Sequence, residues 1–123
     1  MIRLHESAIG HVSGRAIYTD EQHEPVGMLS VYPVQAPHAH ARIKKIDTAR
    51  AAALKGVLAV VTAADFPEVA PNTIIPFGET GADAWVSAVI VLARDRVLWR
   101  GHPVAAVAAV DAHVAAAALE LIE

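Results

Sequence analysis

The stretch Pro37-His38-Ala39-His40-Ala41-Arg42-Ile43-Lys44-Lys45-Ile46-Asp47 predicts one strand of a half-buried sheet. From Ala39 onward apolar and polar side chains alternate, which is the pattern of a strand with one buried and one solvated face. Ala41 and Ile43 are therefore expected to face the core, with the cationic side chains between them in water. The segments on both sides of this stretch complete the predicted fold.

Before this strand, residues 28–35 predict another strand from their β-branched content. Pro33 has no backbone N–H and marks an edge position or a bulge. Residues 1–26 show no sustained periodicity of apolar side chains, and the polar cluster 20–25 lies near their end. We expect them to form an amino-terminal arm laid along the domain, which itself spans residues 27–123.

After this strand, Thr48 is expected to cap a short helix over residues 49–55, with Gly56 as its left-handed stop. Residues 57–61 are almost purely apolar, which predicts a strand covered on both faces. Residues 62–65 have the spacing of a capping box and predict one turn of helix.

The middle of the chain is rich in residues that break regular structure. We expect a long loop over residues 67–83, which contain Pro67, Pro71, Pro76, Gly78 and Gly81. The apolar run 86–93 and the short strand-like segment 97–99 follow this loop.

The last part of the chain predicts a strand followed by a helix. Residues 103–110 form the strand, and Asp111 is a good cap for a helix over residues 112–122. This helix is apolar on nearly every side and has no carboxyl-terminal cap, so it needs partners on more than one face. We infer from it that Glu123 is a cut and that a parent chain continues. Together these elements predict an α+β fold, with a mixed sheet, two main helices and a long Pro/Gly loop.

Composition excludes several classes of function. The chain has 123 residues, enough for one core, and its 54% hydrophobic content with only 5% aromatics indicates an interior of Ala, Val, Ile and Leu. A net charge of -3 does not provide the positively charged surface that nucleic-acid binding requires. The longest apolar run, residues 103–110, is far below the ~20 residues that span a membrane. Without cysteine the chain forms no disulfide and ligates no iron-sulfur cluster through thiolates, which fits a cytoplasmic location.

Several blocks, in one order along the chain, carry a resemblance to a known family. They are the stretch quoted first together with Val12-Ser13-Gly14-Arg15-Ala16-Ile17-Tyr18-Thr19-Asp20, Gly56-Val57-Leu58-Ala59-Val60-Val61-Thr62-Ala63-Ala64-Asp65-Phe66-Pro67, Ala93-Arg94-Asp95-Arg96-Val97 and Gly101-His102-Pro103-Val104-Ala105-Ala106-Val107. The chain resembles the amino-terminal α/β hammerhead domain of the molybdopterin-binding subunit in the xanthine dehydrogenase and aldehyde oxidase family. It departs from the family at the insert 72–85 and at His102, where many relatives carry Gln.

The resemblance implies a non-catalytic structural domain of the molybdenum-containing subunit of a xanthine dehydrogenase. The parent enzyme would hydroxylate hypoxanthine or xanthine and pass the electrons through iron-sulfur (2Fe-2S) and flavin (FAD) centres. The partners implied are the remaining domains of the large molybdopterin-binding subunit and an iron-sulfur/FAD subunit. None of the family's catalytic or molybdopterin-binding motifs occurs in this chain, so we expect it to bind no cofactor and to be inactive alone. The alternative is a free-standing protein-interaction domain with no enzymatic role.

Histidines and glycines offer the first candidate sites. His38 and His40 would share one side of a strand, but zinc requires three or four converging ligands and no third is predictably near. We therefore favour a structural role and expect no metal site. Residues 78–81, Gly-Glu-Thr-Gly, have the spacing of a phosphate-clamping loop, but the central Glu79 would repel a phosphate. No dinucleotide-binding or Walker motif occurs.

Asp20, Glu21 and Glu24 could form an acid/base group, but they lie in a polar segment with no apolar pocket to raise a pKa. A solvated turn is the preferred interpretation.

His102 lies between Gly101 and Pro103, in a turn beside a predicted buried strand. Bonding to local backbone is the favoured role, with a catalytic role as the alternative. Trp85 and Trp99 are interpreted as residues for packing or for a domain interface.

Overall fold

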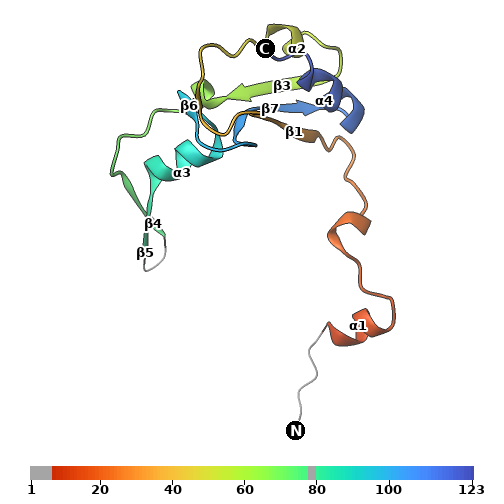
Figure 1. The fold of residues 1–123 in the computed structure, drawn as a ribbon. Coiled ribbons are helices and arrows are strands. Elements are labelled where there is room, and N and C mark those ends of the chain that lie inside the picture. Colours follow the sequence, from red (N-terminus) through yellow and green to blue (C-terminus); the bar gives the residue numbers. More distant parts are fainter. Residues whose placement is uncertain (1–6, 78–79) are drawn as a thin grey trace.

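The computed structural model describes residues 7–77 and 80–123, and its centre is a three-stranded antiparallel sheet (Figure 1). The strand order is β1 (Ser30–Gln35), β7 (Pro103–Ala109), β3 (Val57–Thr62). Helix α4 (Ala112–Leu119) packs across these strands, and α2 (Ala49–Ala52) contacts β3 and α4. We call this sheet with its two helices the body. It confirms the predicted α+β class.

The central strand β7 carries the core. Ala105, Val107 and Ala109 alternate along it with no exposed surface, as expected for one face of a strand beneath a helix. Ala115 and Ala118 are the fully buried residues of α4. Because most of these side chains are methyl groups, the helix can approach the sheet closely, and the core needs few large residues.

The two edge strands test the predictions for residues 28–35 and 57–61. Pro33 lies on the edge strand β1, as predicted. An edge strand has a neighbour on one side only, so a residue without an N–H is tolerated there. The prediction that residues 57–61 are covered on both faces is wrong, because Leu58 and Ala59 of β3 are exposed, Leu58 at 58%. The predicted mixed sheet is also wrong, since every ladder among the described residues is antiparallel.

A second, shorter ladder forms beside the body. Strand β2 (Ala41–Arg42) pairs with β6 (Arg96–Val97), so the strand expected over residues 39–47 is only two residues long. The predicted alternation holds, because Ala41 and Ile43 pack against a small core and the side chains between and after them are exposed. That core consists of Ala36, Ala93 and Val97.

Two of the three predicted helix caps are present in the structure, and the third is not. The Asp111 Oδ1 accepts from the Val114 N–H at 2.8 Å, as predicted. The Thr62 and Asp65 side chains form the expected capping box around the 3-10 helix η2 (Ala63–Asp65). Thr48 makes no side-chain cap for α2, however.

The first turn of α2 is held by the residue before Thr48. The Asp47 Oδ1 accepts from the Ala49 N–H at 3.1 Å, and α2 ends at Ala52, three residues earlier than expected. Gly56 has the predicted left-handed conformation, with φ +97°. The Asp47 backbone also pairs with Glu123, with the Asp47 N–H donating to the Glu123 carbonyl at 2.7 Å.

Residues 67–83 are not the continuous loop that was predicted. They contain a hairpin of β4 (Ile74–Phe77) and β5 (Thr80–Asp83), followed by helix α3 (Ala84–Val91), which the sequence did not predict. Asp83 starts α3, because its Oδ1 accepts from the N–H groups of Trp85 at 2.9 Å and Val86 at 3.1 Å. We call residues 73–77 and 80–92 the α3 extension.

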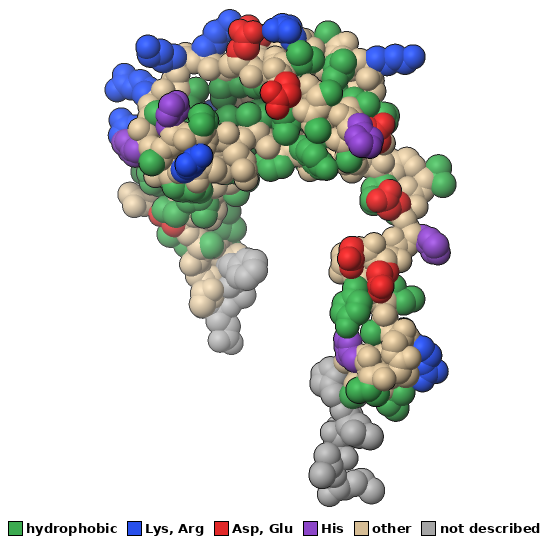
Figure 2. Space-filling model, turned by 45° about the vertical axis from the view of Figure 1, so that its right-hand side comes forward, with side chains coloured by type: hydrophobic (Ala, Val, Ile, Leu, Met, Phe, Trp, Pro, Cys, Tyr) green, Lys and Arg blue, Asp and Glu red, His purple; other side chains and the backbone are tan. Residues whose placement is uncertain are grey.

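The amino-terminal arm leads away from the body instead of lying along it, so that expectation is wrong (Figure 1). It contains the short helix α1 (Ala8–Val12) and a 3-10 turn, η1 (Thr19–Glu21), and neither has a buried residue. The arm and the α3 extension leave the body on the same side (Figure 2). No helix in the described part of the chain has the length and apolar character needed to cross a membrane.

Candidate functional site

His102 is the one polar residue of the described chain that is buried completely. It lies in the turn before β7, next to Gly101, whose φ of +89° lets the chain reverse sharply. The Leu98 N–H donates to Nδ1 at 3.1 Å, and Nε2 lies 2.9 Å from the Val89 carbonyl oxygen. Because Nδ1 accepts, Nε2 must carry the hydrogen and donate to Val89, which fixes one neutral tautomer.

The surroundings of His102 indicate a positioning role. The Trp99 ring stacks on the imidazole with centroids 3.8 Å apart and an interplanar angle of 19°. The bond to Leu98 is the local backbone contact that the sequence suggested, whereas the bond to Val89 crosses to α3, thirteen residues away. Both ring nitrogens are thus occupied by backbone, and neither is available for proton transfer to a substrate.

Arg94 ties the segment after α3 to the turn after β3. Its Nη2 donates to the carbonyl oxygens of Ala63 at 2.6 Å and Phe66 at 3.0 Å, and its Nη1 lies 3.8 Å from a Glu68 carboxylate oxygen. Nothing in the sequence assigned Arg94 a role, because its two acceptors are backbone carbonyls about thirty residues away. Arg94 lines two hollows on the surface.

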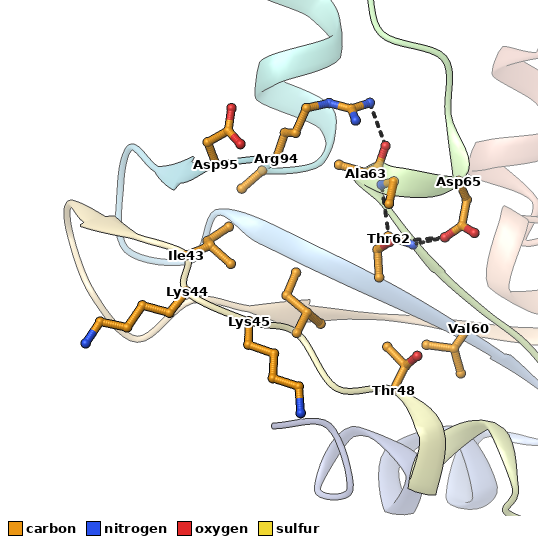
Figure 3. A pocket seen from close by; sticks show the side chains of 13 residues that line it. Ile43, Lys44, Lys45, Thr48, Val60, Thr62, Ala63, Asp65, Arg94 and Asp95 are labelled. Atoms are coloured by element: carbon orange, nitrogen blue, oxygen red, sulfur yellow. Dashed lines mark hydrogen bonds between the residues drawn. The ribbon is translucent and has the colours of Figure 1, made fainter.

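The first hollow encloses about 480 Å³ between the segment after β2, the end of β3 and the segment after α3 (Figure 3). Two of its charged side chains, Asp65 and Arg94, bond within the chain. The Asp65 Oδ2 accepts from the Thr62 N–H at 2.7 Å, and Arg94 is held by the carbonyls described above. Lys44 points away from the hollow in Figure 3. This arrangement assembles no acid/base pair.

Lys45, on the same rim, is paired with Asp47 at 2.7 Å. The hydrogen bond from the Lys45 ammonium, followed by that from the Ala49 N–H, lowers the pKa of the Asp47 carboxyl. The same hydrogen bond, together with the carboxylate charge, raises the pKa of Lys45. Both groups are exposed, so this pair stabilises the rim only weakly.

The second hollow, about 830 Å³, lies between residues 66–71, helix α3 and residues 94–98, and we call it the apolar groove. Its lining is mainly apolar, with the side chains of Phe66, Val69, Trp85, Leu92 and Leu98, and it also includes the charged residues Glu68, Arg94, Asp95 and Arg96. A concave surface of this kind suits contact with another apolar surface better than a polar substrate.

The other sequence candidates are dispersed. His38 and His40 are both exposed, and among the described residues no three His, Cys, Asp or Glu side chains gather as metal ligands would. Residues 20–24 form an exposed turn in which the Glu21 Oε2 accepts from the Tyr18 N–H at 3.0 Å. In the glycine-containing segment, Gly78 and Glu79 fall outside the described residues.

The remaining half of that segment belongs to β5. A Cβ added at Gly81 would lie 2.5 Å from the Ile74 Cγ2 on the paired strand, so Gly81 allows the hairpin to close. The predicted packing roles of the tryptophans are partly visible. Trp99 stacks on His102, and Trp85 lines the apolar groove.

Comparison with known proteins extends these observations. Residues 13–123 match the family model described as "Aldehyde oxidase and xanthine dehydrogenase, a/b hammerhead domain". The carbon monoxide dehydrogenase large chain of Afipia carboxidovorans is 43% identical over 115 residues, 94% of this chain and 13% of that protein. A probable xanthine dehydrogenase subunit of Bacillus subtilis is 34% identical over 121 residues, 98% of this chain and 15% of that protein.

The solved structures agree. A crystal structure of the Cu,Mo-CO dehydrogenase superposes with a TM-score of 0.69 at 37% identity, covering 98% of this chain and 14% of that one. The antiparallel sheet and the helices packed on it define a hammerhead domain. The chain belongs to the aldehyde oxidase and xanthine dehydrogenase family. It spans about an eighth of the length of the carbon monoxide dehydrogenase large chain that it matches.

Proposed function

We propose that this chain is a non-catalytic structural domain of the large, molybdenum-containing subunit of an oxidoreductase. The observation that supports this most is the coverage: 94% of the chain aligns at 43% identity with only 13% of a carbon monoxide dehydrogenase large chain. His102 bonds backbone groups through both ring nitrogens, and Arg94 Nη2 donates to two backbone carbonyls, so both side chains connect distant parts of the fold.

The donor set of the described residues does not fit a metal or a cluster. The chain has no cysteine, and no three potential ligands converge in the described ranges 7–77 and 80–123. We therefore assign molybdopterin, the 2Fe-2S centres and FAD to other parts of the parent enzyme, and we assign no catalytic step to this chain. We propose that the parent is cytoplasmic, because a chain without cysteine fits a reducing compartment in which disulfides are rare.

For the parent reaction we propose hydroxylation of hypoxanthine or xanthine. The match to the probable xanthine dehydrogenase of Bacillus subtilis, which covers 98% of this chain, supports this substrate class. Oxidation of carbon monoxide is the second candidate, because the carbon monoxide dehydrogenase large chain has the higher identity, 43% against 34%. The remaining parts of the large subunit and an iron-sulfur/FAD subunit would be the partners in either case.

The test is to purify the natural protein that contains this sequence and to measure its mass, its molybdenum content and its turnover of xanthine, hypoxanthine and carbon monoxide. We expect a polypeptide several times longer than this chain, with molybdenum, that oxidises a purine. Turnover of carbon monoxide alone would select the second candidate. A natural protein of 123 residues without molybdenum would refute the proposal and favour a free-standing interaction domain.

A further inference from the structure

Helix α3 exposes apolar side chains on more than one of its sides. Trp85 and Val91 line the apolar groove, whereas Val86 and Ile90, one turn apart, do not line it. All four side chains are exposed, with Ile90 at 47%. A helix in contact with water usually has one polar face, and this helix has none.

The hairpin that carries α3 has the same character. Ile74 and Ile75 on β4 are both exposed. Asp83 is the only charged side chain among the described residues of the α3 extension, and its carboxylate is occupied by the N–H groups of Trp85 and Val86. Figure 2 shows this extension as a mainly hydrophobic projection, whereas most of the Lys and Arg side chains lie on the upper part of the molecule.

The α3 extension is nevertheless held in a defined position. At its base, the Val89 carbonyl accepts from His102, and the Ala93 N–H directly after the extension donates to the Pro103 carbonyl at 2.8 Å. Within the extension, the Ala84 N–H donates to the Thr73 carbonyl at 2.7 Å and joins α3 to the hairpin. An eight-residue helix is too short to be stable on its own in water. The α3 extension is therefore fixed at its base and exposes apolar side chains on several sides. Such a surface is complementary to a recess that is itself apolar.

We propose that the α3 extension inserts into an apolar, uncharged recess formed by the remainder of the parent polypeptide. This inference rests on the proposed function, because the relatives carry more than four fifths of their length outside the aligned segment, and that length supplies the recess. One part of the remaining polypeptide fills the apolar groove and contacts Trp85. Another part covers Val86 and Ile90 on the side of α3 that does not line the groove. The body, whose core is closed by α4, needs no such cover on β7.

The two tryptophans provide an internal comparison that requires no mutation. Trp85 and Trp99 are 42% and 40% exposed in this chain, but only Trp85 belongs to the α3 extension. Hydroxyl-radical oxidation of the intact parent protein is measured at both residues and normalised to the same residues in the unfolded protein. We expect Trp85 to react about tenfold more slowly than Trp99, because packing in such an interface is as dense as in a protein interior.

A matched pair of substitutions in the parent protein gives a second readout. Ile90→Asp is expected to lower the yield of assembled enzyme about tenfold, since it places an unpaired carboxylate in the recess. Leu58→Asp changes a side chain of similar exposure on β3 and is expected to leave the yield within about twofold. Equal losses from both variants would contradict the assignment to the α3 extension.

The outcomes separate this inference from the proposed function. A natural protein no longer than this chain overturns both. A longer, molybdenum-containing parent in which Trp85 reacts as fast as Trp99 overturns the recess alone. Protection of Trp85 that appears only when protein concentration is raised would identify a second copy as the occupant, and it would also overturn the proposal.

Discussion

The body and the α3 extension use similar side chains in opposite ways. In the body, small apolar residues on β7 and α4 are fully buried against one another, whereas the apolar residues of α3 remain exposed around most of the helix. Both helices have eight residues, and each follows an aspartate whose carboxylate accepts from the helix backbone, from two N–H groups at Asp83 and from one at Asp111. Local helix chemistry is thus the same, and the difference lies in which surfaces the chain itself can cover.

The largest expected effect breaks the body. Ala118→Asp places a carboxylate at a fully buried position of α4 with no partner, and should lower the free energy of unfolding by about 4 kcal/mol or more. Ala117→Asp, on the exposed side of the same helix, should cost no more than about 0.7 kcal/mol. Urea unfolding of the chain compares the two. Similar costs would show that α4 does not pack as described.

The next largest effect is expected from a substitution that removes the connection between the body and the α3 extension. His102→Leu removes the acceptor for the Leu98 N–H and the donor for the Val89 carbonyl, and should cost about 2–4 kcal/mol because buried backbone groups lose their partners. His102→Gln offers an amide oxygen as acceptor and an amide NH2 as donor, both bonded to Cδ, and should restore more than half of that loss. Thermal unfolding is the measurement. A Gln variant as unstable as the Leu variant would refute the two-bond role of His102.

Two cap substitutions sharpen the comparison. Asp111→Ala should lower the global free energy of unfolding by about 1 kcal/mol, because α4 belongs to the core. Asp83→Ala should leave global unfolding unchanged and speed amide exchange within α3 about fivefold, because α3 opens locally. Urea unfolding and hydrogen exchange distinguish the two regions. A global loss from Asp83→Ala would show that α3 is part of the cooperative core.

The smallest expected effect concerns the Lys45–Asp47 ion pair at the rim of the first hollow. The Lys45 hydrogen bond lowers the folded-state pKa of Asp47, so its contribution to stability is present above the unfolded-state pKa and is lost as pH falls through the folded-state pKa. Lys45→Ala should raise the pKa of Asp47 toward its ordinary value, with no resolvable change in unfolding because both groups are exposed. NMR titration of the Asp47 carboxyl measures it. An unchanged pKa would show that Lys45 does not hold that carboxylate.

Elements defined by local chemistry were predictable from the sequence. The strand 103–110, the Asp111 cap, the capping box after β3 and the left-handed Gly56 all depend on residues within a few positions of one another. The resemblance carried by the ordered blocks likewise led to the correct family, because those blocks are contiguous in the sequence.

The errors share a different cause. Residues 57–61 are apolar enough for a strand covered on both faces, but this chain leaves Leu58 and Ala59 of β3 exposed. The apolar run 86–93 has no polar face to reveal helical periodicity, so α3 was missed. The bonds of Arg94 to Ala63 and Phe66, and that of His102 to Val89, join distant backbone groups that leave no pattern in the sequence.

Amide hydrogen exchange, compared between this chain alone and the parent protein, tests most directly the claim that the body is complete by itself and the α3 extension is not. We predict that the amides of β7 are protected in both, whereas those of α3 become protected only in the parent. Protection of α3 in the chain alone that equals that of β7 would contradict the account.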